Sequence, residues 1–314
     1  MHGFTASTMQ NKKIGRVFKS EVTQIVHPFG GMRNRLPPCA KLSVDCSKDN
    51  AKLDLKLQGK TALVTGASYG LGFACAQALA EEGASIAICS RDMEKVKNAA
   101  WQISEATGTK ALGISADLTD KDDLQRVFDE ARAFLNGIDI LVVSTGHPPT
   151  YPFSQATDEQ WQLGEQLVLR PPIVLSRLVL PAMKQKKFGR IIFIGSIFGL
   201  EAESSSVVQS TLRTGLNAMA KCIATEVAED GVTVNVICPG YFETPLVENL
   251  ALQYANAQNT TRAEVLEDWK KYSPVKRFGK PEDLGALVAF LSSPRAEFIT
   301  GTTVTIDGGA VRKY

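Results

Sequence analysis

From residue 59 onward the sequence alternates between short β-rich runs and helical patterns, an order that few folds accept. Strands separated by helices predict a parallel sheet covered by helices on both faces. With 44% hydrophobic residues the chain can bury such a core. About seven strands favour an α/β fold made of one doubly wound domain over residues 53–314. The predicted strands are 60–64, 85–89, 111–115, 138–143, 190–194, 233–237 and 303–306, and the predicted helices are 72–82, 93–107, 120–135, 158–187, 209–229 and 281–291.

A proline pair conflicts with the long helix expected over residues 158–187. Pro171 and Pro172 each remove a helical N–H, and each ring clashes with the preceding turn at a cost of roughly 3 kcal/mol in a helix interior. We therefore expect a kink or a break there, which bends the helix against the sheet.

A glycine-rich turn joins the first predicted strand to the first predicted helix. Glycines permit a tight turn, and their missing Cβ atoms let the backbone approach a pyrophosphate. The helix N-terminus adds free N–H groups and a partial positive charge. Because strand, turn and helix follow in the required order, we predict a dinucleotide site rather than an unused turn. The turn residues assigned to the cofactor are Gly66, Ser68, Tyr69, Gly70, Leu71 and Gly72.

The ends of the second and third strands bear on which dinucleotide is bound. An acid after the second strand would favour NAD by binding the ribose 2′-OH, but Ser90 and Arg91 stand there. Arg91 can pair with a 2′-phosphate, so NADP(H) is favoured over NAD(H), although a solvated surface arginine is the alternative. A second basic residue could have stood within the glycine turn at position 69, but Tyr69 is found there. Asp117 and Leu118 follow the third strand, where Asp117 could accept from the adenine amino group or cap the next helix.

The N-terminal segment differs in composition from the rest of the chain. Residues 1–52 carry nine Lys/Arg against three Asp/Glu, a net charge of +6, whereas residues 53–314 carry 26 against 30, a net charge of −4. The segment reads as a flexible extension, with an organelle transit segment or a docking arm as alternatives. The main domain has no broad basic excess to suggest nucleic-acid binding, and no uninterrupted apolar run reaches the roughly 20 residues of a membrane span. We expect a cytoplasmic protein, or an organelle-matrix protein if residues 1–52 are a transit segment.

The cysteines and histidines give no metal-binding pattern. Six cysteines are scattered without C-x-x-C spacing, and the three histidines lie far apart in the sequence. No zinc site is expected, and the cysteines are typical of reduced core residues.

With the glycine turn, Asp117, Ser196 and the pair Pro239-Gly240 in register, the chain resembles the short-chain dehydrogenase/reductase family over about residues 57–309, and most of all its 3-oxoacyl-(acyl-carrier-protein) reductase-like group. The resemblance implies a Rossmann-type fold, a carbonyl or alcohol substrate, and a homodimer or homotetramer formed through the fourth and fifth helices. It also assigns Gly146, Pro239, Gly240 and Thr244 to the cofactor, and residues 246–275 to a substrate lid. Within that lid the polar stretch from Gln253 to Thr261 is expected to be flexible, and an amphipathic stretch with Trp269 follows.

The chain departs from the family at its catalytic positions. Family members use an asparagine, a serine, a tyrosine and a lysine. The resemblance places Ser196 at the serine, Val168 at the asparagine, Gln209 at the tyrosine and Arg213 at the lysine. The site residues carried over are therefore Ser196, Gln209 and Arg213, with Arg213 also expected to hold the nicotinamide ribose.

These departures bear on proton transfer. A tyrosine flanked by a lysine can deliver a proton, whereas a glutamine amide cannot titrate near neutral pH and an arginine does not deprotonate usefully. General acid catalysis contributes about 10²–10⁴-fold, so turnover need not vanish without it. Replacement donors could be Ser196, Ser210, His147 or Tyr241.

Three functions follow from the sequence. The first is an NADP-linked oxidoreductase acting on a carbonyl, an alcohol or an acyl thioester. The second is a nucleotide-binding protein without turnover, acting as a sensor or as a partner subunit in an oligomer. The third is a halohydrin dehalogenase, a class that resembles this chain in having arginine for the lysine. Those enzymes keep a tyrosine and lose the glycine turn, the opposite of this chain, and the third function is therefore disfavoured.

Overall fold

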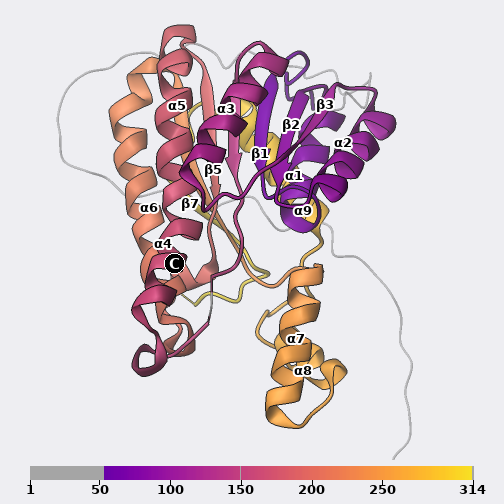
Figure 1. Ribbon diagram of the computed structural model, residues 1–314, viewed down its shortest axis with the longest axis vertical. Helices are drawn as coiled ribbons and strands as arrows, with labels where there is room; N and C mark the ends of the chain where they lie inside the picture. The colour runs from indigo at the N-terminus through magenta and orange to yellow at the C-terminus, as the bar shows by residue number, and fades with distance from the viewer. Residues whose placement is uncertain (1–52, 149, 313–314) are drawn as a thin grey trace, which may run out of the picture. The chain divides into compact units, whose positions relative to one another are not determined.

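Seven parallel strands form a single sheet in the order β3-β2-β1-β4-β5-β6-β7. The structure is a computed structural model that describes residues 53–148 and 150–312, and the predicted N-terminal extension, residues 1–52, lies outside them. The predicted doubly wound α/β fold is confirmed (Figure 1). Its strands are β1 Thr61–Thr65, β2 Ser85–Ser90, β3 Ala111–Ser115, β4 Ile140–Val143, β5 Gly189–Ile194, β6 Val232–Pro239 and β7 Thr303–Ile306, and its helices are α1 Gly70–Glu81, α2 Met93–Thr107, α3 Lys121–Leu135, α4 Asp158–Val168, α5 Arg170–Lys186, α6 Val207–Val227, α7 Pro245–Gln258, α8 Arg262–Lys270 and α9 Pro281–Ser292.

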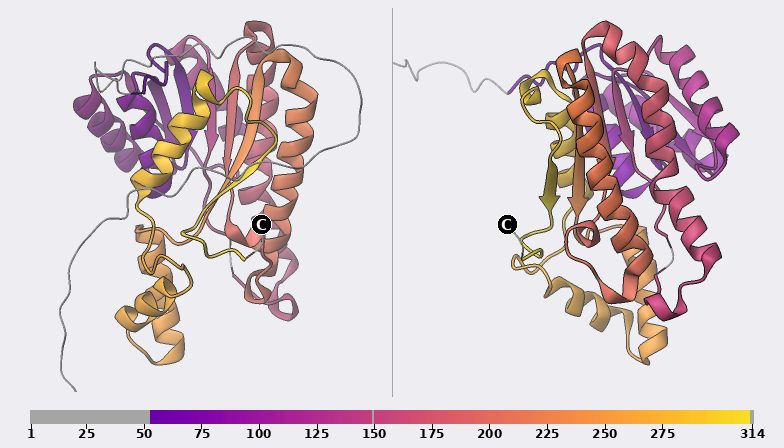
Figure 2. Two further views of the ribbon diagram at one scale, coloured as in Figure 1. Left: turned by 180° about the vertical axis from the view of Figure 1, so that it is seen from behind. Right: turned by 90° about the vertical axis from the view of Figure 1, so that its left-hand side faces the viewer.

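Helices cover both faces of the sheet, and each face has its own core. Successive side chains of a strand point to opposite faces, so every strand feeds both cores. In β1, Ala62 and Val64 pack against α1, α2 and α9, whereas Leu63 lies in the core beneath α3, α5 and α6. Figure 2 shows these two helical layers from behind and from the side. This burial on both faces explains why the strands read as almost continuously apolar runs.

The helix expected over residues 158–187 is broken, as the proline pair predicted. It divides into α4 and α5 at Leu169, and Pro171 and Pro172 lie in the first turn of α5. Proline is tolerated there because the first N–H groups of a helix have no intrahelical partner. By length and composition the joined stretch Asp158–Lys186 would also pass for a membrane span. However, Leu175, Val179 and Met183 are buried against the sheet, so α5 is a helix of the core.

The carboxyl ends of β1 and β4 are held together by one buried side chain. The Thr65 hydroxyl donates to the Ser144 carbonyl oxygen at 2.7 Å and accepts from the Ser144 N–H at 3.1 Å. At the next residue the two backbones come so close that a Cβ added to Gly66 would lie 2.6 Å from the Ser144 carbonyl oxygen. Gly66 also has φ +59°, a conformation that glycine adopts without strain.

The segment between β6 and α9 contains two helices, α7 and α8, which project from the rest of the domain in Figure 1. The expectation of a flexible stretch from Gln253 to Thr261 was wrong, because α7 continues to Gln258 and Thr261 caps α8. Ala251, Ala255 and Val265 form a small core between the two helices, with Trp269 packed against it. The apolar spacing of these four residues is the signal that the polar residues among them concealed.

We predict that replacing Thr65 with valine destabilises the domain. The substitution leaves the buried N–H and C=O of Ser144 without their partner, which costs roughly 1–3 kcal/mol in the free energy of unfolding. Urea unfolding would measure the loss. The same change at Thr305, which is exposed on β7, provides the control and should have little effect. Equal stability of the two variants would contradict the role given to the Thr65 hydroxyl.

Candidate active site

A cavity of about 680 Å³ lies at the carboxyl ends of the strands, and it brings together the residues assigned from the sequence to the cofactor with Ser196, Gln209 and Arg213. In parallel sheets of this type ligands bind at this edge. The predicted residues in its wall are Gly66, Ser68, Tyr69, Gly70, Leu71, Gly72, Ser90, Arg91, Asp117, Leu118, Gly146, Ser196, Gln209, Arg213, Pro239, Gly240 and Thr244.

The glycine turn after β1 has the geometry of a phosphate cradle. Gly70 has φ +64° and begins α1. The N-cap residue Tyr69 makes no side-chain cap hydrogen bond, so the first N–H groups of the helix have no capping side chain. A Cβ on Gly72 would lie 2.3 Å from the Gly66 carbonyl oxygen, so the turn can close only with glycine at this position. No acidic residue lies in the first turn of α1 to compete for an anion. The turn therefore fits a dinucleotide pyrophosphate.

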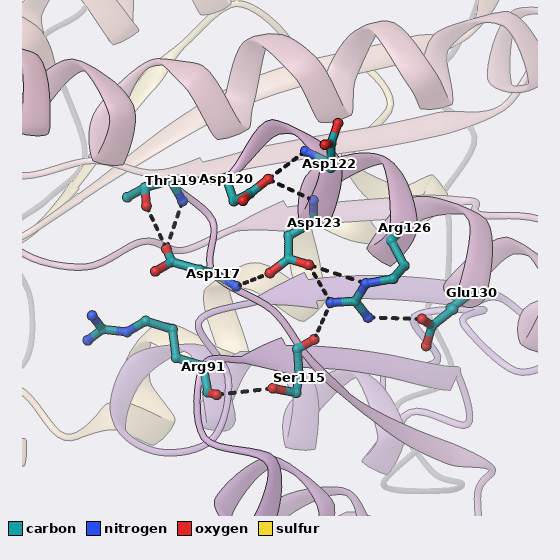
Figure 3. Close-up of polar contacts among 9 residues, drawn as sticks. All are labelled: Arg91, Ser115, Asp117, Thr119, Asp120, Asp122, Asp123, Arg126 and Glu130. Carbon is teal, nitrogen blue, oxygen red and sulfur yellow. Dashed lines mark hydrogen bonds and ion pairs between the residues drawn. The ribbon is translucent and has the colours of Figure 1, made fainter.

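The end of β2 presents two basic side chains to the cavity. Arg91 is exposed, and among the described residues its guanidinium has no hydrogen bond or ion pair; only its carbonyl oxygen is bound, by the Ser115 hydroxyl at 3.0 Å (Figure 3). Lys95, in the first turn of α2, lies in the same wall and pairs with Asp92 at 3.0 Å. The sequence analysis looked for a second basic residue at position 69, where Tyr69 stands, and missed Lys95. Lys95 lies four residues after Arg91, and the first turn of α2 brings it into the same wall.

Asp117 does not cap the following helix, which corrects one of the two roles considered for it. Asp120 is the N-cap of α3 and accepts from the N–H groups of Asp122 and Asp123. Asp117 instead accepts from the N–H and hydroxyl of Thr119, at 2.9 and 2.8 Å (Figure 3). Its other carboxylate oxygen has no protein partner in the described residues, so it remains available to an amino group in the cavity.

Ser196 follows β5 and stands in the cavity wall. Its hydroxyl oxygen accepts from the Phe198 N–H at 3.2 Å, which leaves its own hydrogen free to donate. The loop that carries it is tied to α6 through Gly199, whose carbonyl oxygen accepts from Thr214 and Asn217, each at 3.1 Å. Gly199 also packs on the α6 backbone, where a Cβ would lie 2.9 Å from Arg213. The serine is thus fixed relative to α6.

Gln209, at the beginning of α6, is buried and bonded to His147 in the β4–α4 loop. Its side-chain amide donates to His147 Nε2 at 3.0 Å and to the Thr150 hydroxyl at 3.4 Å. Because an amide nitrogen can only donate, His147 Nε2 is an acceptor and the ring proton lies on Nδ1. Burial, and then the positive charge of Arg213, lower the pKa of His147 to about 4. The imidazole is therefore neutral at neutral pH.

Arg213 lies one helical turn after Gln209, and it is 6% exposed. Its Nη1 donates to the Ile194 carbonyl oxygen at 2.6 Å, at the end of β5. Its Nε is buried and has no hydrogen-bond partner in the described part of the chain. Burial lowers the pKa of Arg213 to about 10, which leaves the guanidinium charged at neutral pH.

Three other sequence candidates have structural surroundings that limit their chemistry. The Tyr241 ring stacks on Trp269 with 5.2 Å between centroids, and burial raises its pKa to about 12. The Ser210 hydroxyl accepts from the Glu203 N–H at 3.0 Å and is not part of the cavity wall. Val168 is 1% exposed at the end of α4 and is likewise outside the wall.

The cavity also has an apolar side, of which only the part from residues 246–275, expected as a substrate lid, was assigned from the sequence. It comes from α4 and from the first turns of α7, whose N-cap is Thr244. No local sequence motif marks these residues, because they come together only when two helices that are distant in the sequence face the same edge of the sheet. They are Leu163, Leu167, Leu246, Val247 and Leu250.

Comparison with known proteins places the chain in a family of reductases. The sequence profile described as Enoyl-(Acyl carrier protein) reductase matches residues 66–311. The 3-oxoacyl-[acyl-carrier-protein] reductase FabG of Aquifex aeolicus (strain VF5) is 32% identical over 82% of this chain and 99% of its own length, and that of Escherichia coli (strain K12) is 34% identical over 81% and 98%. The structure of L-sorbose reductase from Gluconobacter frateurii, complexed with NADPH and L-sorbose, superposes with a TM-score of 0.80 at 30% identity, covering 83% of this chain and all of that one.

The chain belongs to the short-chain dehydrogenase/reductase family. Within it, the chain is similar to the 3-oxoacyl-[acyl-carrier-protein] reductases over nearly their whole length.

The low pKa of His147 predicts how stability depends on pH. Between pH 6.5 and 4 the unfolded chain binds a proton at this histidine and the folded chain does not, so stability is full above pH 6.5 and falls with pH through that window. His147→Asn should remove this contribution, and its urea-unfolding profile should be flatter by up to about 1.4 kcal/mol per pH unit. Parallel profiles for the two proteins would show that His147 titrates normally in the fold.

Proposed function

We propose that this chain is an NADP(H)-linked oxidoreductase that interconverts a carbonyl group and an alcohol with an atypical active site. The observation that carries the proposal is the shared cavity, which runs from the glycine turn after β1 to Ser196, Gln209 and Arg213. At the positions where the family's tyrosine and lysine are expected, the chain has Gln209 and Arg213.

The cofactor would be held along the strand ends. Gly66, Gly70 and Gly72 form the cradle for the pyrophosphate, Asp117 offers a carboxylate oxygen to the adenine amino group, and Arg91 with Lys95 would bind a 2′-phosphate. When bound, the cofactor supplies or accepts the hydride.

The remaining polar groups can stabilise charge on the substrate oxygen. Ser196 has a hydroxyl hydrogen to donate, and Arg213 carries a buried positive charge toward the same end of the cavity. Gln209 contributes less than its amide would suggest, because His147 and Thr150 already accept from its nitrogen. We infer that Ser196 donates to the developing alkoxide, that the positive charge of Arg213 stabilises it from the same end of the cavity, and that its proton comes from water.

A second function is favoured by the same hydrogen bonds. In the described cavity wall no side chain near Ser196 changes its protonation near neutral pH: His147 has a pKa of about 4, Tyr241 of about 12 and Arg213 of about 10. A protein that binds the nucleotide without turnover, as a sensor or an oligomer partner, needs no such group. This is the alternative against which the reductase is tested.

NADPH oxidation over a panel of carbonyl compounds, including a 3-oxoacyl thioester, separates the two functions. We expect wild type to turn over at least one compound. The variant Val168→Asn/Gln209→Tyr/Arg213→Lys, which restores the family's catalytic residues, should be faster by about 10²–10⁴-fold because it regains a general acid. Turnover by the triple variant but not by wild type would favour a nucleotide-binding protein without turnover. Ser196→Ala, introduced into wild type and into the triple variant, provides the inactive control.

The preference for NADP(H) is tested by removing the two cations at the end of β2. Charge-assisted hydrogen bonds of about 1.5–3 kcal/mol would be lost, so Arg91→Ala/Lys95→Ala should raise the Kd for NADPH by roughly 10–100-fold and leave that for NADH nearly unchanged. Nicotinamide fluorescence measures both constants. Lys97→Ala, on the exposed face of α2, is the matched control. Equal weakening of both cofactors would exclude a 2′-phosphate site here.

A further inference from the structure

Arg213 is a buried cation for which the described residues provide no counter-charge. Its hydrogen bond to the Ile194 carbonyl oxygen involves a neutral partner, and it forms no ion pair with any described residue. Charges removed from water are normally paired with an opposite charge, because an unpaired one loses its hydration without compensation. The buried Nε without a partner shows that the guanidinium is also incompletely hydrogen-bonded.

Among the described residues no carboxylate pairs with Arg213 or shifts its pKa. Glu203, on the loop that precedes α6, accepts from the Ser205 N–H at 3.1 Å and from the neighbouring serine hydroxyls. Asp92 and Asp117 line the cavity at the ends of β2 and β3, three and four strands away from β5. At about 4.8 Å per strand, their strand ends lie roughly 14–19 Å from the end of β5, to which Arg213 is bonded, and this is too far for an ion pair.

The neighbours of Arg213 add no negative charge either. His147 is neutral, and the pKa of the Cys238 thiol is raised to about 11 by burial. Gln209, one turn earlier on α6, is neutral as well. A pyrophosphate in the glycine turn would lie at β1, two strands and roughly 10 Å from β5, and the hydroxyls of a nicotinamide ribose carry no charge.

We propose that the substrate carries a carboxylate beside its carbonyl or alcohol carbon and that Arg213 binds this carboxylate; the inference rests on the oxidoreductase proposed above. Arg213 lines the same cavity as Ser196 and bonds to the Ile194 carbonyl oxygen, two residues before the serine, so a substrate whose oxygen meets the serine can reach the guanidinium. The planar fork of arginine donors matches a carboxylate, which a lysine ammonium does not. The arginine thus selects oxo acids or hydroxy acids over their neutral relatives.

The test compares acid and ester probes on the full chain saturated with NADP⁺, because the oxidised cofactor cannot reduce them. Isothermal titration calorimetry would give the Kd of pyruvate against methyl pyruvate, and of acetoacetate against methyl acetoacetate. Each ester removes the charge and adds one methyl group. We expect wild type to bind at least one acid 10-fold or more tightly than its ester. Equal binding within both pairs would overturn the proposal.

Variants assign the preference to Arg213. Arg213→Met should bind acid and ester within about twofold of each other, whereas Arg177→Met, which deletes an exposed arginine of α5, should keep the wild-type ratio. An acid preference that survives in Arg213→Met would overturn the assignment. The ratio is the readout because both probes meet the same cofactor complex, so any effect of Arg213 on the cofactor cancels.

Two provisions keep the outcome independent of folding and of turnover. Apolar replacement of a buried charge is usually tolerated, and if Arg213→Met nevertheless fails to fold, Arg213→Lys should lower the ratio by losing the fork; an unchanged ratio in Arg213→Lys would then overturn the assignment. If the chain binds no NADP⁺, the oxidoreductase proposal fails, and the same titrations on the cofactor-free chain still decide the carboxylate site.

Discussion

The close approach of the backbone at the carboxyl ends of β1 and β4 is the constraint on which the rest of the site depends. Gly66 can face Ser144, and Gly72 can face Gly66, only because neither has a Cβ. The Thr65 hydroxyl, which binds both the N–H and the C=O of Ser144, fixes this spacing in the buried sheet. The glycine turn, the His147 loop and α1 all take their positions from it, and the cavity opens where these backbones diverge again.

The opposite end of the cavity is organised by α6 rather than by the glycine turn. Arg213 bonds to the end of β5, Thr214 and Asn217 hold the loop that carries Ser196, and Gln209 reaches across to His147. Substitution at one of these positions alters the hydrogen bonds available to the others. The glutamine and the arginine are therefore best understood together with the neutral histidine, as one polar arrangement.

Sequence patterns predicted the fold well because the sheet is buried on both faces. Runs such as 140–143 and 191–194 have to be apolar throughout, and the glycine turn has to occur where a strand passes into a helix. The helix break at Leu169 was likewise predictable from the chemistry of proline. The residues assigned from the sequence to the cofactor and to catalysis line one cavity, and the role of each one is a prediction.

What sequence patterns missed depends on contacts between distant segments. The engagement of Gln209 by His147 joins residues 62 positions apart, and no local pattern encodes it. Asp120 rather than Asp117 capped α3 because the chain makes one further turn around Thr119 before the helix begins. The helix α7 was overlooked because its buried residues are small alanines that pack on α8 instead of on the sheet, whereas larger apolar side chains such as Leu252 and Tyr254 are exposed.

The small core of α7 and α8 has a consequence for how such a protein can change. Ala251, Ala255 and Val265 belong to neither of the two cores that flank the sheet, and α7 supplies Leu246, Val247 and Leu250 to the cavity wall. The pair of helices is attached through the Tyr241–Glu243 segment, which pairs with Gly279. Residues 245–271 are thus a module whose outer and inner faces can be redesigned or exchanged without disturbing either main core, so that selectivity can evolve separately from folding.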